Sequence, residues 1–551
     1  MKDTIISMYG SHNSAIALSI DGVIQPIIEV ERFCNAKNAA TSQYKVVNNP
    51  HIVVQSIMNW IKKTYNIEEF DVCLHQNTEV IYDEITYIMH SYINAKTKIS
   101  QKHHESHAAG AFYQSPYKEA LIFSFDGGGN DGKFNIYMAE RSSGVTLLTS
   151  VLNPIKGSPH IYYDLGFPYM IFGHYLKDIR YESIGDGNLV YSGKIMGLVS
   201  YGNINYEWLP HFINFYKQDP QGHNYIELLN TLGNEIGVTF DQNDRLDGQL
   251  AYDIAATSQK AFEECFLEVA RPYMEMYPNL PICMAGGCAL NIILNTKLVN
   301  EFNKSVFVGP NPSDCGIAIG SLLNYLKPSD PIDLTYMGIP ILDIDLLSDY
   351  AQSLPVRELT TEQVFNPYFK IHSDILLNDI VEGSIVGVMR GNSEHGPRAL
   401  GNRSILCNPS IPNMKNVLNE KVKNREWYRP FAPVVRLEDV DKYFEWNFES
   451  RWMSFCPVVR PEWREKLISI THVDNTARVQ TVTKAQNEWL YNLLSKLEDA
   501  TGVGVLLNTS FNVNGKPILS TVKDGFEIYN KTQLDCLLIE NVYFRKKGFF
   551  V

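Results

Sequence analysis

Two histidines in the segment HHESH are spaced for metal binding. His103 and His107 lie four residues apart, which places both imidazoles on one face of a helix, where they can share one ion. Position 108 is alanine, so the segment does not complete the His-Glu-x-x-His motif of zinc proteases, and Glu105 is not predicted to act as their base. The alternative interpretation is that these histidines pack against neighbouring strands or face solvent.

Two aspartates complete a candidate ligand set. Asp126 follows the apolar run 119–125 and opens a loop in which Gly127 and Gly128 allow the backbone to approach a ligand closely. Asp314 stands where the apolar run VFVG gives way to the start of a helix. Two imidazoles and two carboxylates suit a divalent iron-like or zinc-like ion better than a thiolate metal. Each aspartate is, alternatively, a helix cap.

A second glycine motif follows the predicted strand PICMA. Gly286 and Gly287 precede a predicted helix from Ala289, and a helix N-terminus after a glycine turn can hold a phosphate group. Asn291 lies in the same segment and joins the two glycines as a candidate nucleotide-binding residue. A glycine pair after a strand is common, so this motif indicates a ligand only together with others.

Basic residues of the C-terminal third stand beside Gly, Pro, Ala and Phe and have few acidic neighbours. They are Arg398, Arg403, Lys423, Arg425, Arg429 and Arg478. The segment LLNTSFN adds the polar side chains of Asn508, Ser510 and Asn512. This composition favours a recessed anion pocket in which guanidinium groups contact phosphate or carboxylate oxygens. Arginines on a solvated surface are the alternative.

The N-terminal part of the chain predicts the elements that carry these residues. Strands are predicted over 4–8 and 15–20 with a polar turn between them, and a similar pattern returns at 119–125 and the following FNIYMAE. This repeat predicts a duplicated α/β unit, with unrelated hairpins as the alternative. Apolar spacing predicts helices over 51–65 and 253–270.

Length and composition predict two α/β domains. At about 100–200 residues per domain, 551 residues exceed one domain, and 45% hydrophobic with 20% charged residues are typical of a globular protein. The Pro-containing segment 327–333 and a change in motif character after it place the domain boundary near residue 345. We therefore expect domains over 1–345 and 346–551.

Charge and cysteine content exclude several classes of protein. The 61 acidic and 48 basic residues give a net charge of −13, which disfavours general binding to nucleic acid. Nine scattered cysteines without a C-x-x-C pair indicate neither a disulfide framework nor a zinc ribbon. No apolar segment suits a signal sequence or a membrane span, so we expect a cytoplasmic protein, with a homodimer as the commonest assembly.

Taken in order, the motifs resemble those of the O-carbamoyltransferase family of nodulation and antibiotic-tailoring enzymes (NodU/CmcH type). The resemblance is carried by HHESHAA, FDGGGNDG, GKIMGLVSYG, AGGCALN, PNPSDCGIAIG, EHGPRALGNRSIL, VKNREWYRPFAP, THVDNTARVQTV and LLNTSFN. These strings extend over nearly the whole chain. Several long strings in one order are far less expected by chance than a single short motif.

The resemblance implies a fold and a metal. Residues 1–345 are expected to form a duplicated α/β domain of the actin-like ATPase (ASKHA) superfamily, similar to the tRNA threonylcarbamoyl-transfer proteins. Residues 346–551 are expected to form an α/β domain similar to threonylcarbamoyl-adenylate synthases (YrdC-like). The family's iron, or another divalent metal, would be held by His103, His107, Asp126 and Asp314.

The resemblance also implies a reaction. The C-terminal domain would join carbamoyl phosphate to ATP, with Mg²⁺, to give carbamoyl adenylate, pyrophosphate and phosphate. The N-terminal domain would then pass the carbamoyl group to an acceptor hydroxyl and release AMP. Substrate and nucleotide contacts are expected from Arg398, Lys423, Arg429, Arg478, Asn508 and Ser510, and from Gly127, Gly128, Gly286, Gly287 and Asn291. The expected catalytic residues among them are Arg398, Lys423 and Arg478.

His12, in the turn between the first two predicted strands, is the candidate for binding or deprotonating the acceptor hydroxyl. The acceptor is expected to be a sugar, a natural product or a hydroxymethyl nucleotide, and the motifs do not distinguish them. Two other functions compete with carbamoyl transfer: an actin-like-fold small-molecule kinase and a non-catalytic nucleotide-binding protein. A kinase would have no use for the second, basic domain.

Overall fold

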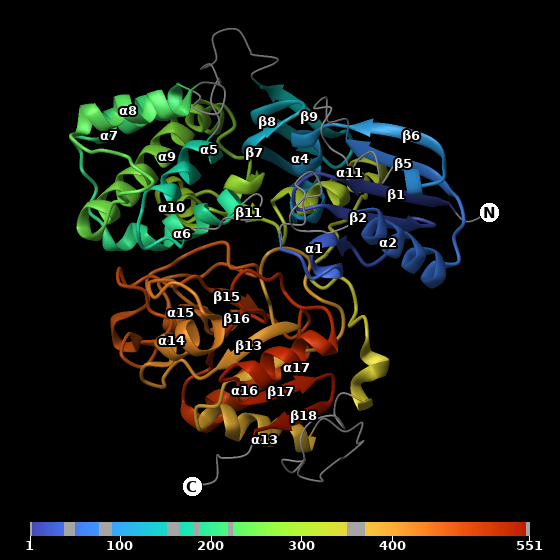
Figure 1. Ribbon diagram of the computed structural model, residues 1–551. Helices are drawn as coiled ribbons and strands as arrows, with labels where there is room; N and C mark the ends of the chain where they lie inside the picture. Colours follow the sequence, from blue (N-terminus) through green and yellow to red (C-terminus); the bar gives the residue numbers. More distant parts are fainter. Residues whose placement is uncertain are drawn as a thin grey trace. The chain divides into compact units, whose positions relative to one another are not determined.

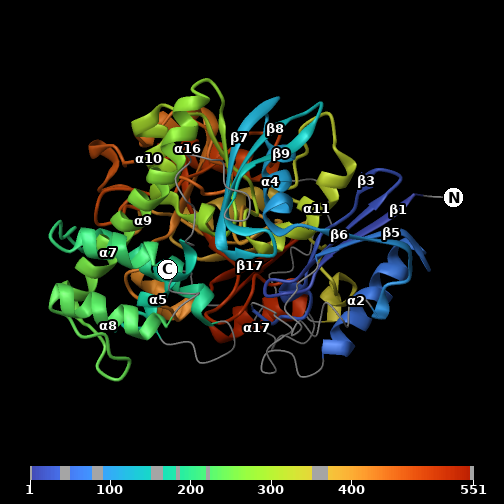
Figure 2. The ribbon, with the colours of Figure 1, turned by 90° about the horizontal axis from the view of Figure 1, so that it is seen from above.

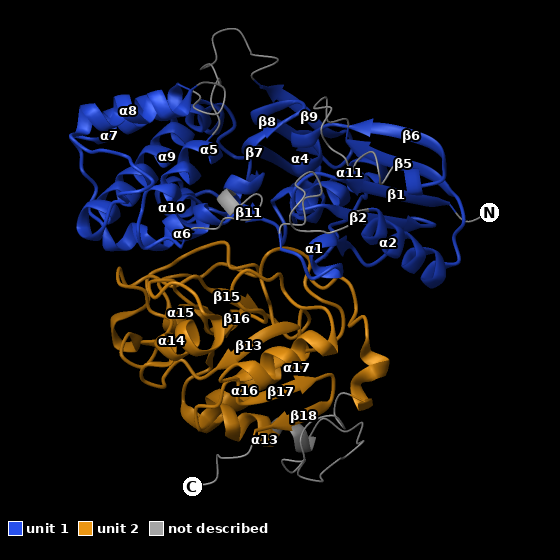
Figure 3. Ribbon diagram, viewed as in Figure 1, with its two compact units in different colours: residues 1–334 blue, residues 335–551 orange. Residues whose placement is uncertain are grey.

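The computed structural model describes residues 3–37, 50–76, 91–150, 165–180, 187–218, 224–349 and 370–546 (Figure 1). The chain divides into two compact α/β units, Met1–Leu334 (unit 1) and Thr335–Val551 (unit 2), as Figure 3 shows. The boundary predicted near residue 345 lies inside unit 2. The segment 335–345 is tied to unit 2 by two hydrogen bonds: the Gly338 N–H donates to the Ser393 carbonyl, and the Val522 N–H donates to the Asp343 carboxylate.

One sheet of unit 1 is formed by the N-terminal strands. They are β1 (Thr4–Tyr9), β2 (Ala15–Ile20), β3 (Val23–Ile24), β4 (Ile28–Glu29), β5 (Phe70–Gln76) and β6 (Ala95–Gln101). The strand order is β3-β2-β1-β5-β6, with β4 paired to β2. β1 and β2 confirm the two strands predicted at the start of the chain, and nearly all their side chains are buried.

A second sheet of unit 1 repeats this topology. Its strands are β7 (Glu119–Gly129), β8 (Gly132–Glu140), β9 (Gly144–Thr149), β10 (Ile282–Ala285) and β11 (Val306–Val308), in the order β11-β10-β7-β8-β9. In both sheets the first three strands are antiparallel neighbours. Of the two later strands, one pairs in parallel with the first strand and the other pairs in parallel with that later strand. The predicted duplication of one α/β unit is therefore present in the strand topology.

Two helices pack between the sheets of unit 1. α4 (His103–Gln114) packs on β7, β8 and β10, whereas α11 (Ile317–Leu326) packs on β1, β2 and β5, and the two helices contact each other (Figure 1). A Cβ atom on Gly320 would lie 2.0 Å from the Ser106 carbonyl oxygen, so only glycine allows this close approach. The hydroxyls of Ser106 and Ser321 lie 2.8 Å apart at the same crossing. This contact fixes the distance between the histidine-bearing helix and the segment before α11.

The other described α-helices of unit 1 are α1 (Val30–Phe33), α2 (Pro50–Tyr65), α5 (Gly166–Ile171), α6 (Tyr191–Leu198), α7 (Leu209–Lys217), α8 (Tyr225–Ile236), α9 (Gly248–Met276) and α10 (Ile292–Phe302). α2 and α9 confirm the helices predicted over 51–65 and 253–270. α7 lies beside α8 and α9 in both views (Figures 1 and 2). The helix predicted from Ala289 begins at Ile292 instead, because the Asn291 side chain accepts from the Leu294 N–H and starts the helix there.

Unit 2 is built on one mixed sheet with the order β15-β14-β16-β13-β12-β17-β18. Its strands are β12 (Val386–Met389), β13 (Arg403–Cys407), β14 (Ala432–Arg436), β15 (Gln480–Val482), β16 (Val505–Ser510), β17 (Cys536–Ile539) and β18 (Val542–Arg545). Its described α-helices are α13 (Lys370–Val381), α14 (Met414–Val417), α15 (Val440–Tyr443), α16 (Glu488–Thr501) and α17 (Val522–Lys531).

The core of unit 2 lies between this sheet and α13 and α16. Leu490, Leu494 and Leu497 of α16 pack with Val388 and Leu506 of the sheet, and all are almost completely buried. Burial of such apolar side chains is the main stabilising contribution to this layer. Across the described ranges of the chain, no helix combines the length and the apolar character needed to cross a membrane.

Candidate functional site

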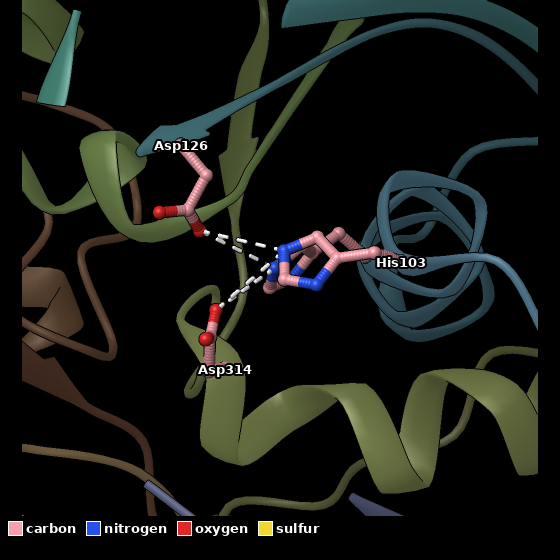
Figure 4. A group of neighbouring side chains, drawn as sticks. His103, Asp126 and Asp314 are labelled. Atoms are coloured by element: carbon pink, nitrogen blue, oxygen red, sulfur yellow. Dashed lines mark ion pairs between the residues drawn. The ribbon is translucent and has the colours of Figure 1, made fainter. Parts of the chain in front are cut away.

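Four side chains from three segments converge in unit 1. Figure 4 shows His103 of α4, Asp126 at the end of β7, and Asp314 just before α11 pointing toward one another. With His107 of α4, they place one ligand atom each within 4.8 Å of the others. His107 Nε2 lies 3.4 Å from an Asp126 oxygen and 3.3 Å from an Asp314 oxygen. His103 Nε2 lies 4.0 and 3.8 Å from the same two oxygens.

The chemistry of these groups fits a divalent ion. Nε2 of both histidines is buried and has no hydrogen-bond partner among the described residues, although each faces carboxylate oxygens. Burial lowers the pKa of His107, but the nearby carboxylates of Asp126 and Asp314 outweigh it and raise this pKa to about 9. The two aspartates therefore create a strong negative potential at this point. A bound cation would offset it.

Asp126 is held by backbone amides from both glycine motifs. Its Oδ1 accepts from the Gly127 N–H at 2.6 Å, and its Oδ2 accepts from the Gly287 N–H at 2.8 Å. Gly286 has a φ of +85°, and a Cβ atom there would lie 2.1 Å from the Phe125 carbonyl oxygen, so glycine is required. The structure thus brings together two motifs that are far apart in the sequence.

The loop between β7 and β8 also fixes the N-terminus of α4. The Asn130 side chain accepts from the His103 N–H at 2.9 Å, and the Asp131 carboxylate accepts from the His104 and Glu105 N–H groups at 2.8 and 3.2 Å. These bonds satisfy N–H groups that a helix leaves open in its first turn. Neither capping residue is predicted from the sequence, because the N–H groups of His103 and His104 lie 27 residues before Asn130 and Asp131, respectively.

His12 and Tyr9 contact the other oxygen of Asp314. His12 lies in the turn after β1, and its Nδ1 is 3.3 Å from Asp314 Oδ2. The Tyr9 hydroxyl, at the end of β1, donates to the same oxygen at 2.7 Å. The predicted acceptor-side histidine and a predicted metal ligand are therefore neighbours. Tyr9 is not among the predicted site residues, since a tyrosine that ends an apolar strand is more often a core residue.

Asn291 and Gly128 have structural contacts of their own. Asn291 Oδ1 accepts from the Leu294 N–H at 3.0 Å, and its Nδ2 donates to Gln259 Oε1 at 2.9 Å, so its amide serves as the cap of α10. Gly128 has a φ of +142° and lies where the register of the β7–β8 pair shifts. Each residue belongs to one of the two glycine motifs that meet at the Asp126 carboxylate, where the Gly287 N–H donates to Asp126.

Four arginines of unit 2 lie close enough to repel one another. Burial, followed by the charge of Arg429, lowers the pKa of Arg398 to about 10. Burial and the charges of Arg398 and Arg429 lower the pKa of Arg478 well below its ordinary value. Arg425 is affected in the same way by burial and by the charges of Arg429 and Arg478, which lower its pKa. Four of the basic residues that the sequence analysis groups together, Arg398, Arg425, Arg429 and Arg478, therefore lie close to one another.

This arginine cluster carries more positive than negative charge. Glu426 pairs with Arg429 at 3.5 Å, and among the described residues no other acid forms an ion pair with the four arginines. Nε of Arg398 and Nε of Arg478 are buried and have no hydrogen-bond partner in the described part of the chain. Guanidinium groups in this state favour an anionic ligand, which would supply both the missing charge and the missing acceptors.

The other predicted residues of unit 2 hold the protein's own backbone. Lys423 Nζ donates to the Ser510 carbonyl at 2.6 Å, to the Asn512 carbonyl at 2.9 Å and to the Asn512 side chain. Ser510 Oγ donates to Asn512 Oδ1 at 2.8 Å. Asn508 Nδ2 donates to the Ala399 carbonyl at 3.0 Å and so supports the loop that precedes β13. These contacts shape the segments around the arginine cluster.

Comparison with known proteins gives consistent matches over both units. The family model "Carbamoyltransferase N-terminus" matches residues 63–323, and "Carbamoyltransferase C-terminus" matches residues 377–546. The chain is 32% identical to nodulation protein NolO of Bradyrhizobium diazoefficiens over 81% of this chain and 79% of that protein. An uncharacterised protein of Synechocystis is 29% identical over 97% of this chain and 95% of its own. The 3'-hydroxymethylcephem-O-carbamoyltransferase of Amycolatopsis lactamdurans is 36% identical over 49% of each chain.

Proposed function

The chain belongs to the carbamoyltransferase family and is a transferase, and we propose that it is an ATP-dependent O-carbamoyltransferase. In this proposal, carbamoyl phosphate supplies the carbamoyl group and a hydroxyl of a small molecule receives it. The observation that carries the proposal is the arginine cluster of unit 2, in which one acid, Glu426, faces four arginines and the buried Nε groups of Arg398 and Arg478 have no hydrogen-bond partner in the described part of the chain. Carbamoyl phosphate and ATP are both anions that such a cluster would bind.

In unit 2, the proposed reaction joins the carbamoyl group to AMP. One water is consumed as phosphate leaves carbamoyl phosphate, and the resulting carbamate oxygen attacks the α-phosphorus of ATP, so that pyrophosphate, with its Mg²⁺, is released. Arg398, Arg429 and Arg478 would stabilise the negative charge that develops on the phosphoryl oxygens. Lys423, Asn508 and Ser510 would shape this site through the backbone contacts described above. We propose a YrdC-like fold for unit 2.

In unit 1, the proposed reaction passes the carbamoyl group from the adenylate to the acceptor hydroxyl and releases AMP. We propose an actin-like domain for unit 1, which the repeated strand order and the two helices packed between the sheets support. Gly127, Gly128, Gly286, Gly287 and Asn291 lie on the loops that we propose to face the nucleotide.

A divalent ion, with iron as the proposed identity, would be held by His103, His107, Asp126 and Asp314. When bound, this ion would polarise the carbamoyl oxygen or orient the adenylate. The ligand atoms lie within 4.8 Å of one another, and the two histidine Nε2 atoms have no hydrogen-bond partner among the described residues, which supports this assignment.

His12 is the proposed base for the acceptor hydroxyl. Its Nδ1 lies 3.3 Å from Asp314 Oδ2, and the negative charge of this carboxylate favours the tautomer that carries its proton on Nδ1. In this tautomer Nε2 keeps its lone pair and can accept a hydroxyl proton. A carboxylate that orients a histidine in this way is a common arrangement for general-base catalysis. The side chain of His12 is 34% exposed, so a substrate can reach it.

The proposed acceptor is a small molecule with a hydroxyl group, such as a sugar, a natural product or a hydroxymethyl nucleotide. The cephem relative supports this class, because its name describes O-carbamoylation of a hydroxymethyl compound. Purified protein, ATP and carbon-labelled carbamoyl phosphate would be incubated with a panel of hydroxyl compounds, and products would be separated by mass. Label in a carbamoylated product that depends on ATP supports the proposal. Phosphorylated products would favour a kinase.

A further inference from the structure

The two oxygens of Asp314 face two different sets of side chains. Oδ1 lies 3.3 Å from His107 Nε2 and 3.8 Å from His103 Nε2. Oδ2 accepts the hydrogen bond from the Tyr9 hydroxyl at 2.7 Å and lies 3.3 Å from His12 Nδ1. One oxygen therefore points to the proposed metal site and the other to β1 and the turn after it. A carboxylate without such contacts turns readily about its last torsion.

Tyr9 is well placed to hold this orientation. Its side chain is 4% exposed, and its residue is the last of β1, whose pairing with β2 and β5 fixes the backbone. The carboxylate oxygen of Asp314 can only accept, so the Tyr9 hydroxyl is the donor in this hydrogen bond. The Tyr9 ring also packs edge-on against the His103 ring, with centroids 6.1 Å apart. Tyr9 thus contacts two of the four proposed ligands.

We propose that Tyr9 is a positioning residue of the metal site, which holds Asp314 Oδ2 so that only Oδ1 is presented to the ion. This inference rests on the metal site of the proposed function and adds a residue that the sequence motifs do not single out. Groups that hydrogen-bond to metal ligands orient them, and their loss typically weakens metal affinity by about 10–100-fold. Without Tyr9, Asp314 could rotate and present both oxygens, which would change the coordination of the ion.

Cobalt(II) titration of the purified full-length apoprotein tests this role, because the absorption of Co²⁺ reports the number and geometry of its ligands. Tyr9→Phe removes the hydroxyl and keeps the ring. We expect about 10–100-fold weaker Co²⁺ binding and an altered visible spectrum. Tyr216→Phe is the matched control, since it removes a buried hydroxyl of unit 1 that lies 2.9 Å from Ser258 Oγ. It should leave both the affinity and the spectrum unchanged.

A second pair of variants keeps the test independent of packing defects. Tyr9 is replaced with 4-aminophenylalanine, which retains an N–H donor, or with 4-methylphenylalanine, which has the same size and no donor. The amino variant should restore affinity and spectrum to near wild-type values, and the methyl variant should behave like Tyr9→Phe. Equal Co²⁺ binding by these two variants would overturn the role of the hydrogen bond.

The outcomes also separate this inference from the metal site itself. If the wild type binds one Co²⁺ per chain and Tyr9→Phe binds it with the same affinity and spectrum, Tyr9 is a packing residue and only this inference is wrong. If the wild type binds no Co²⁺, or if His103→Ala binds Co²⁺ as tightly as the wild type does, the metal site of the proposed function is wrong together with this inference.

Discussion

Replacing Arg398 with methionine is expected to weaken substrate binding and, at the same time, to stabilise unit 2 in the absence of substrate. Methionine keeps an unbranched apolar stem and removes the guanidinium group. Burial, followed by the charge of Arg429, lowers the pKa of Arg398, and burial with the charges of Arg398 and Arg429 lowers the pKa of Arg478. Arg398 Nε is buried and has no hydrogen-bond partner in the described part of the chain. The free protein therefore carries a repulsion that an anionic substrate would relieve.

The magnitude follows from the local electrostatics. The pKa of Arg398 falls from 12.5 to about 10, which corresponds to roughly 3 kcal/mol against its charged form. The group remains charged at neutral pH, so this cost is fully present there. Because solvent reaches part of the side chain, we expect a gain of about 1–2 kcal/mol in the free energy of unfolding, or roughly 2–8 °C in Tm. Loss of one charge-assisted hydrogen bond, about 1.5–3 kcal/mol, should weaken ligand binding by roughly 10–150-fold.

Thermal unfolding with and without carbamoyl phosphate and ATP measures both effects. Arg403→Met is the matched control, because Arg403 is completely buried and its guanidinium donates to the carbonyls of Arg390 at 2.7 Å and Gly391 at 2.8 Å. This variant should lower Tm, since it removes the donors of two partly buried carbonyls and leaves an empty space where the buried guanidinium lay. If Arg398→Met lowers Tm as Arg403→Met does, or if its Tm still rises with the ligands as in the wild type, the assignment of an anion site is refuted.

Three further substitutions test the proposed roles of other residues. His12→Asn should slow carbamoyl transfer by about 10²–10⁴-fold and leave carbamoyl-dependent pyrophosphate release unchanged; an undiminished transfer rate with normal metal content would reduce His12 to a turn residue. Asp314→Ala should remove the metal and abolish transfer while pyrophosphate release continues, as metal analysis and a release assay would show; loss of release in the folded variant would contradict separate reactions in the two units. Lys423→Met should lower Tm, because it leaves the oxygens of Ser510 and Asn512 unpaired at about 1–3 kcal/mol per buried group; an unchanged melting curve would show that the ammonium group does not hold this loop.

The spacing of apolar residues along the sequence was sufficient to predict the strands and helices that bury one side of the element. The strands over 4–8 and 15–20 and the helices over 51–65 and 253–270 show apolar spacing that depends only on neighbouring residues. His103 and His107 share a face of α4 for the same reason, since four residues make about one helical turn. The duplicated topology could also be predicted, because each half opens with a strand, a polar turn and a second strand.

Contacts between distant segments could not be predicted in the same way. Tyr9 meets Asp314 across 305 residues, and Lys423 meets Ser510 across 87, so no local spacing indicates either pair. The helix predicted from Ala289 begins later because a side-chain cap, rather than the glycine turn, sets its start. For arginines, composition predicted the cluster, but only the packed structure distinguishes Arg398 and Arg478, which lie among other arginines, from Arg403, whose terminal NH groups donate to backbone carbonyls.

Cleavage of ATP that depends on carbamoyl phosphate is the step on which the proposed function rests. The most direct measurement is pyrophosphate release from ATP by the purified protein without an acceptor, in the presence and absence of carbamoyl phosphate. We expect pyrophosphate to appear only with carbamoyl phosphate, accompanied by an equal amount of phosphate. Formation of ADP, or pyrophosphate release that does not respond to carbamoyl phosphate, would contradict the proposed reaction.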